Sequence, residues 1–199
     1  MVLSLISFVA AAQQSSSEAI IEAINLKSSQ MKSLQCEFVQ TKHLSILNDK
    51  MVSYGKMYFE QPGKLRWEYT KPYTYIFIMN SDQVMLKNDS RTDVIDIKQN
   101  RTFREIANIM MNSISGKCLS DTKAFKITIA ETPQEWTATL IPQKRDMKMM
   151  WSRLVLHFDR AKRMVSVVEM HEPTGDSTII KLSESVENKD IDEHIFSIK

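Results

Sequence analysis

Residues 53–72, SYGKMYFEQPGKLRWEYTKP, say more about the fold than any other stretch of the chain. Leu65, Trp67 and Tyr69 alternate with charged residues, which is the period of a strand with one buried face. The segment 52–59 precedes this strand and is predicted to be its hairpin partner. Residues 61–64 between them, Gln-Pro-Gly-Lys, predict a tight turn, because proline fixes φ and glycine accepts a positive φ at the two central positions.

Strand patterns continue on both sides of this hairpin. The segment 73–79 is apolar or aromatic at six of seven positions, so we expect it to be covered on both faces. Further strands are predicted from residue 36 onwards and at 83–87, 93–97, 125–129, 136–140, 154–158, 165–170 and 178–182. About eleven strands in one continuous meander predict a barrel, a sandwich or a strongly curled sheet with helices over its open side.

Two segments predict helices. The first begins at the capping box Ser15-x-x-Glu18, and apolar side chains then recur near every 3.6 residues at Ile20, Ile21, Ile24, Met31 and Leu34. The second begins at Thr102-x-x-Glu105 and ends at Gly116. Its apolar stripe consists of Phe103, Ile106, Met110 and Ile114.

Residues 1–12 form a short apolar run that ends in three alanines. This pattern predicts a signal peptide cleaved near Ala12, because the run is too short to span a bilayer. No Lys or Arg precedes the run, so an apolar tail is the alternative. Residues 13–199 are then predicted to form a single domain.

The composition excludes several classes of function. With 26 Lys and Arg against 24 Asp and Glu, the net charge is +2, and no basic stripe predicts a nucleic-acid partner. Four glycines form neither of the glycine-rich phosphate-binding motifs. Thirteen methionines suit either a ligand-adapting surface or ordinary filling of the core. Cys36 and Cys118 are either a disulfide or two separate buried thiols.

No catalytic or metal-binding pattern is present. The four histidines fall in no H-E-x-x-H or H-x-H spacing, and there is neither C-x-x-C nor G-x-S-x-G. Glu169 and Glu172 could suggest acid–base chemistry, but no further motif supports it. The sequence predicts no enzyme, cofactor or metal.

Taken in order, these segments resemble the LolA family of periplasmic outer-membrane lipoprotein carriers. The resemblance rests on Phe38-Val39-Gln40, on SYGKMYF at 53–59, on PGKLRWEY at 62–69 with Pro72, and on the tail IFSI at 195–198. It extends from about Ser17 to the C-terminus, and its first half is the more specific part.

The resemblance implies a mainly β (α+β) fold, in which a curled, incompletely closed antiparallel β-barrel of about eleven strands is lidded by α-helices. The implied function is that of a soluble, monomeric periplasmic carrier. It would take the acyl chains of lipoproteins from an inner-membrane ABC transporter and pass them to an outer-membrane acceptor. The alternatives are a carrier or sensor for another lipid, such as a glycolipid or phospholipid, and an interaction protein whose barrel is filled by side chains.

Residue roles follow from the resemblance by position. The acyl-chain cavity would be lined by Met57, Phe59, Leu65, Trp67, Tyr69 and Phe77. The inner face of the lid would consist of Phe103, Ile106, Met110 and Ile114. Gln61 stands where members of the family often carry an arginine that gates the lid, and without a charge its hold on the lid should be weaker. Spacing alone also allows all the apolar positions to be ordinary core.

Overall fold

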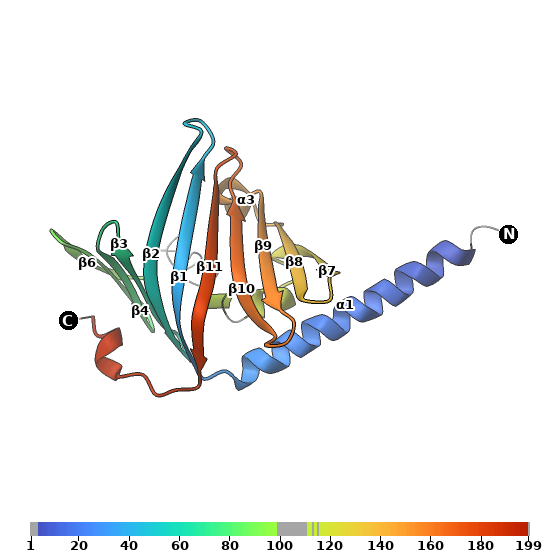
Figure 1. Cartoon of the computed structure of the whole chain (residues 1–199), viewed down its shortest axis with the longest axis horizontal. Helices are drawn as coiled ribbons and strands as arrows, with labels where there is room; N and C mark the ends of the chain where they lie inside the picture. Colours follow the sequence, from blue (N-terminus) through green and yellow to red (C-terminus); the bar gives the residue numbers. More distant parts are fainter. Residues whose placement is uncertain (1–3, 99–110, 113, 115, 199) are drawn as a thin grey trace.

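The fold comes from a computed structural model, which describes residues 4–98, 111–112, 114 and 116–198, with side chains from Ser17 onwards. Within these residues, eleven strands form one antiparallel sheet (Figure 1). The strands are β1 Ser33–Leu44, β2 Asp49–Glu60, β3 Lys64–Lys71, β4 Tyr75–Asn80, β5 Gln83–Asn88, β6 Thr92–Asp96, β7 Phe125–Glu131, β8 Glu135–Pro142, β9 Arg153–Asp159, β10 Met164–His171 and β11 Ser177–Glu187.

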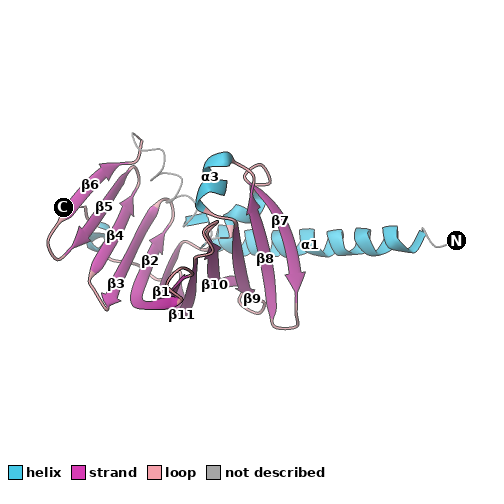
Figure 2. Ribbon diagram, turned by 90° about the horizontal axis from the view of Figure 1, so that it is seen from above, coloured by secondary structure: helices cyan, strands magenta, loops and turns pink. Residues whose placement is uncertain are grey.

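The order of the strands is β6-β5-β4-β3-β2-β1-β11-β10-β9-β8-β7. Each half of the chain therefore forms a meander, and the antiparallel pair β1–β11 joins the two halves. The edge strands of this order are β6 and β7, so the sheet curls without closing (Figure 2). This confirms the prediction of about eleven strands in an incompletely closed barrel.

The hairpin β2–β3 forms as its sequence predicts. Gly63 adopts φ +80° in the turn between Glu60 and Lys64. The register places Met57 opposite Trp67 and Phe59 opposite Leu65. All four side chains are buried, so they define the inner face of the sheet.

The first helix differs from its prediction at both ends. Helix α1 spans Ser4–Gln30 without interruption, so the capping box at Ser15 lies within it. Residues 10–14, Ala-Ala-Ala-Gln-Gln, are strong helix formers that carry the helix through this point. Met31 and Leu34 were expected on the same helical face, but the helix ends before them and Leu34 belongs to β1. In β1, Leu34 pairs with Phe59 and Glu187 instead.

The segment that joins the two edge strands is described only in part. Phe103, Ile106 and Met110 of the predicted second helix lie outside the described residues, whereas Ile114 is helical and buried. Gly116 has φ +74°, as expected of a residue that ends a helix, and the 3₁₀ helix η1 Lys117–Ser120 follows it.

The sequence did not predict the short helix α3, Arg145–Met150. It buries only Met147, and six residues are too few to show a helical stripe in the sequence.

The C-terminal segment covers the outer face of the sheet at β3 and β4, where the 3₁₀ helix η2 Glu193–Phe196 packs (Figure 1). Phe196 is fully buried, and its carbonyl accepts a hydrogen bond of 3.1 Å from Asn80. Ile78 on the outer face and Met79 on the inner face are both buried. The prediction that 73–79 is covered on both faces is confirmed for these two residues.

Candidate functional site

The residues expected to line a cavity share the inner face of β2, β3 and β4. Cross-strand pairing aligns Met57 with Trp67 and Trp67 with Phe77, while Phe59 aligns with Leu65 and Leu65 with Met79. Met57, Phe59, Leu65 and Trp67 are buried, and Tyr69 and Phe77 are partly buried against the same core. The structure therefore brings all six together in one continuous apolar layer.

Strand β1 adds two residues that sequence reasoning did not assign to the site. The ring of Phe38 stacks on Trp67 with a centroid distance of 4.1 Å, and Tyr69 meets the same ring edge-on at 5.3 Å. The Tyr69 hydroxyl donates a hydrogen bond of 2.9 Å to Oε1 of Gln40, and burial raises the pKa of Tyr69. The F-x-Q pattern thus supplies a stacking ring and an acceptor to one face, since strand side chains alternate.

The inner face holds few polar groups. The indole Nε1 atoms of Trp67 and Trp136 are buried and have no hydrogen-bond partner among the described residues. Apart from these two N–H groups, the layer consists of aliphatic and aromatic side chains, and such a surface favours contact with hydrocarbon over a polar ligand.

Helix α1 packs against β7, β10 and η1, in the second half of the sheet, and shares one core with this layer. Ile20 and Ile24 are buried in the same core as the six residues of the sheet, and Ile114 joins them. A side chain on Gly116 would collide with Ile24 and crowd Phe158 of β9, so this glycine allows the close contact between α1 and the segment after Ile114. Trp67, Ile24 and Ile114 belong to one core, which spans both the sheet and its helical cover.

Gln61 ties the end of α1 to the β2–β3 turn. Its Nε2 atom donates hydrogen bonds to the carbonyls of Ser28, at 3.1 Å, and Met31, at 2.7 Å. Carbonyls at the end of a helix lack partners within the helix, and Gln61 supplies partners here. Oε1 of Gln61 accepts a hydrogen bond of 3.2 Å from Nζ of Lys117, which follows the partly described segment. One uncharged side chain therefore contacts α1, the α1–β1 connection and η1.

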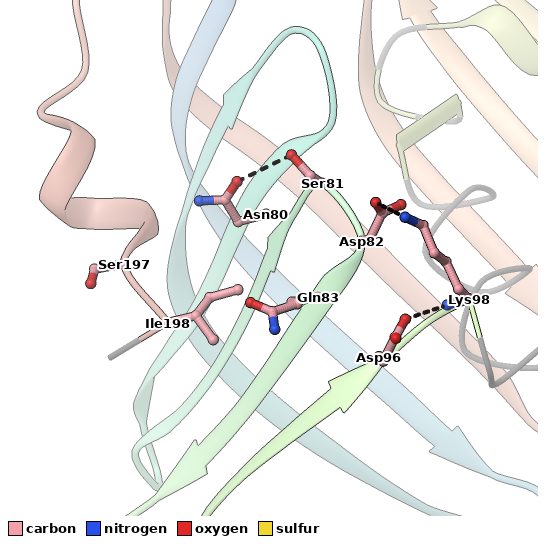
Figure 3. A pocket seen from close by; sticks show the side chains of 8 residues that line it. All are labelled: Asn80, Ser81, Asp82, Gln83, Asp96, Lys98, Ser197 and Ile198. Atoms are coloured by element: carbon pink, nitrogen blue, oxygen red, sulfur yellow. Dashed lines mark hydrogen bonds and ion pairs between the residues drawn. The ribbon is translucent and has the colours of Figure 1, made fainter.

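Two surface hollows lie away from the six residues. One, of about 640 Å³, lies between the β4–β5 turn, Lys98 and the C-terminal residues (Figure 3). In it, Nζ of Lys98 lies 2.6 Å from Asp82, and the Lys98 backbone N–H donates to Asp96. The other hollow, of about 520 Å³, lies beside the α1–β1 connection and includes Met31 and Gln61. Its lining is mainly polar.

A cluster of acids and histidines occupies the outer face of the second half of the sheet. His157 of β9 lies 2.9 Å from Glu135 of β8 and 3.1 Å from Glu169 of β10. Glu169 also lies 2.9 Å from His171. The hydrogen bond to His157 lowers the pKa of Glu135. For Glu169, burial alone would raise the pKa, but the hydrogen bonds to His171 and His157 lower it. These contacts link three strands.

Two further observations concern metal binding and thiol chemistry in the described residues. No group of three or more His, Cys, Asp and Glu side chains there is arranged to hold a metal ion. Cys36 and Cys118 are both buried thiols rather than a disulfide.

None of the helices in the described part of the chain combines the length and the apolar character needed to span a bilayer.

Comparisons with known proteins agree with this geometry. The model of the family "Outer membrane lipoprotein carrier protein LolA" matches residues 29–199. The outer-membrane lipoprotein carrier protein of Methylococcus capsulatus is 26% identical over 124 residues, which are 62% of this chain and 51% of that protein. The match thus spans about half the length of this relative.

Solved structures are similar in fold. An uncharacterized conserved protein from Thermus thermophilus superposes with a TM-score of 0.56 at 9% identity, covering 90% of this chain and 92% of that one. A chain in the MucA/MucB complex of Pseudomonas aeruginosa superposes with a TM-score of 0.52 at 9% identity, covering 90% of this chain and 59% of that one. At such identities the likeness concerns the fold alone.

Proposed function

Because the chain belongs to the family of the outer membrane lipoprotein carrier protein LolA, we propose that it carries lipoproteins by holding their acyl chains against the inner face of its sheet. The observation that carries the proposal is the apolar layer around Trp67, which shares one core with α1, while Gln61 bonds the end of α1 to the β2–β3 turn. Burying an acyl chain away from water is favourable by about 0.8 kcal/mol of free energy for each CH₂ group. A lipoprotein that crosses an aqueous space therefore needs its acyl chains to be covered.

Loading requires the cover to move. Met57 and Leu65 are fully buried, so acyl chains reach the layer only when the core opens, and we place this opening at α1, which shares that core. Gln61 holds α1 through hydrogen bonds without a formal charge, and such bonds are weaker than charge-assisted ones. We therefore propose Gln61 as the gating position, with a cover that opens more readily than an arginine would allow.

The remaining parts of the proposal follow from the family. After removal of residues 1–12, residues 13–199 would act in the periplasm as a soluble monomer. An inner-membrane ABC transporter would load the carrier, and an outer-membrane acceptor would unload it. The carrier catalyses no reaction in this scheme, and it needs no cofactor.

The experiment is native mass spectrometry of residues 13–199 with a triacylated lipopeptide and its deacylated form. We expect one-to-one binding of the acylated form alone. Trp67→Glu should weaken binding about tenfold or more, because a carboxylate would be desolvated in the apolar layer. Trp67→Phe, which keeps an apolar ring and removes the unpaired N–H, is the matched control and should bind within about threefold of the parent.

Other outcomes decide between the alternatives. Binding of phospholipid or glycolipid in place of both lipopeptides would make the protein a carrier or sensor for another lipid. If the folded protein takes up no lipid, the interior is filled by side chains, and the proposal is wrong.

A further inference from the structure

The β1–β2 hairpin carries the most exposed large apolar side chain among the described residues. Ile46 is 89% exposed and Leu47 is 69% exposed, and both lie in the turn of this hairpin. The hairpin projects beyond the neighbouring strands, next to the β10–β11 hairpin (Figure 1). Of eleven exposed large hydrophobic side chains in the described part of the chain, five lie on this hairpin: Ile46, Leu47, Met51, Val52 and Tyr54.

The turn is held in place by the adjacent hairpin. The backbone N–H and the hydroxyl of Ser45 each donate a hydrogen bond of 2.9 Å to Asp176, and the hydroxyl also lies 3.2 Å from the Thr174 carbonyl. Asn48 adopts φ +48°, a conformation that asparagine tolerates better than most residues. The two aliphatic side chains are therefore presented to solvent by a braced turn.

The shape and the charges of this tip favour a lipid bilayer. A convex apex with two adjacent aliphatic side chains has no groove in which a partner's side chain could dock, whereas a bilayer deforms around it. Met51 lies three residues after Asn48, or about 10 Å along the strand, within the depth that interfacial surfaces reach. Lys42 and Lys50 near the tip are outnumbered by Asp49, Glu172 and Asp176, so the tip has no positive excess and suits zwitterionic rather than anionic headgroups.

The tip is also continuous with the inner face. Lys42 pairs with Met51 in the same alternation that places Phe38 opposite Gly55 and Cys36 opposite Met57. Met51 and Leu44 therefore lie on the face that leads down the hairpin to the apolar layer.

We propose that the β1–β2 tip inserts Ile46 and Leu47 into the interface of a phospholipid bilayer and so docks the protein reversibly on a membrane. Docking extends the proposed carriage, because a carrier that exchanges acyl chains must meet a membrane. It is measured separately from acyl-chain uptake.

The experiment is co-sedimentation of the protein with sucrose-loaded vesicles of phosphatidylethanolamine containing a minor fraction of phosphatidylglycerol. The double substitution Ile46→Ser with Leu47→Ser should lower vesicle binding about tenfold or more, because it removes the apolar surface that enters the interface. The control, Leu26→Ser with Val94→Ser, removes two other exposed apolar side chains and should bind within about twofold of the parent. Raising the salt concentration should lower binding by less than about twofold, since the tip has no positive excess that would attract anionic lipid.

Lipopeptide uptake by the same variants separates the two proposals. Loss of vesicle binding with unchanged lipopeptide uptake supports docking through the tip. Vesicle binding that survives both serine substitutions overturns it, as does a parent protein that binds no vesicles, whatever the lipopeptide result. A protein that binds vesicles through the tip but takes up no lipopeptide would retain the docking site and lose the proposed function.

Discussion

Gly55 shows how one residue sets the geometry of the apolar layer. Glycine weakens a strand, yet here a Cβ atom would collide with the Glu68 carbonyl and with the ring of Phe38. The space above Gly55 is what allows the Phe38 ring to lie between β2 and Trp67. Gly55→Ala should therefore destabilise the fold by about 1–3 kcal/mol, the usual cost of overpacking a core.

The measurement is urea denaturation followed by tryptophan fluorescence, with Val52→Ala as the control. Val52 is on the same strand and exposed, so its truncation should change stability by no more than about 0.5 kcal/mol. Equal stabilities of the parent and the Gly55→Ala variant would mean that the ring is not fixed by this contact.

Cys36 should be chemically inert in the folded protein. Burial, with a smaller contribution from the charge of Glu37, raises the pKa of its thiol to about 12. The thiolate is the reactive form, so at pH 8 the folded protein should react with a thiol reagent such as dithionitrobenzoate about a hundredfold or more slowly than the urea-unfolded chain. A Cys118→Ser variant isolates this thiol, and rapid labelling of that folded variant would contradict the prediction.

At this scale, local patterns revealed only part of the site. Alternation alone placed Leu65, Trp67 and Tyr69 on one face, because strand side chains alternate whatever the partner strand is. The packing of Phe38 over Gly55 depends on the register between β1 and β2, which fixes partners seventeen residues apart. The braced tip at Ser45 depends on a hairpin more than a hundred residues away. Neither contact can be predicted from the residues next to it in the sequence.

At the scale of elements, the carbonyls at the end of α1 depend on the side chain of Gln61 for hydrogen bonds. Gln61→Glu keeps the size of the side chain and the acceptor for Lys117, but it removes both donors to Ser28 and Met31. It should lower the free energy of unfolding by about 1–3 kcal/mol, because a carboxylate would face two carbonyls. Gln61→Ala should cost less, since the carbonyls then meet water.

Urea denaturation gives the stability, and hydrogen exchange of the amides in residues 20–30 shows whether the end of α1 is loosened. Faster exchange confined to this helix is the expected pattern. If Gln61→Glu left both measurements unchanged, the contact would not hold the helix.

The strands and the presence of the first helix were predictable, whereas the bounds of that helix were not, for physical reasons. Hairpin turns and the alternation of apolar residues are local, so β2, β3 and the strands of the second half appear in the sequence. The boundary of α1 is a competition between the cap at Ser15 and the helix propensity of residues 10–14, and propensity prevails. Beyond Gln30, pairing with β2 and β11 places Leu34 in a strand although its spacing also fits a helix.

For the whole molecule, the pairing of β1 with β11 is the decisive contact. It joins the first and last strands of the chain and so turns two meanders into one curled sheet. The sequence predicted a meander of about eleven strands, but periodicity carries no information on which distant strands pair. This pairing places both halves of the inner face of the curled sheet around one core.

The second half of that sheet should respond to acid through its outer face. His157 bridges Glu135 and Glu169, and Glu169 also meets His171, so the cluster ties β8, β9 and β10 together. The pKa values of both glutamates are lower in the folded protein than their usual value of 4.5. A carboxyl group with a lowered folded pKa stabilises the fold above its unfolded pKa, and this stabilisation is lost as the pH falls through the folded pKa.

We therefore expect stability to fall as the pH drops below about 4.5, and part of this fall to come from the cluster. Glu135→Gln with Glu169→Gln should cost about 1 kcal/mol at pH 7, the scale of partly exposed pairs, and should flatten the dependence below pH 4.5. Urea denaturation between pH 7 and pH 3 measures both effects. Glu131→Gln with Glu184→Gln, at two exposed positions outside the cluster, is the matched control and should keep the slope of the parent. An unchanged slope in the cluster variant would show that the acid response arises elsewhere, and the three strands would then be held by their backbone pairing alone.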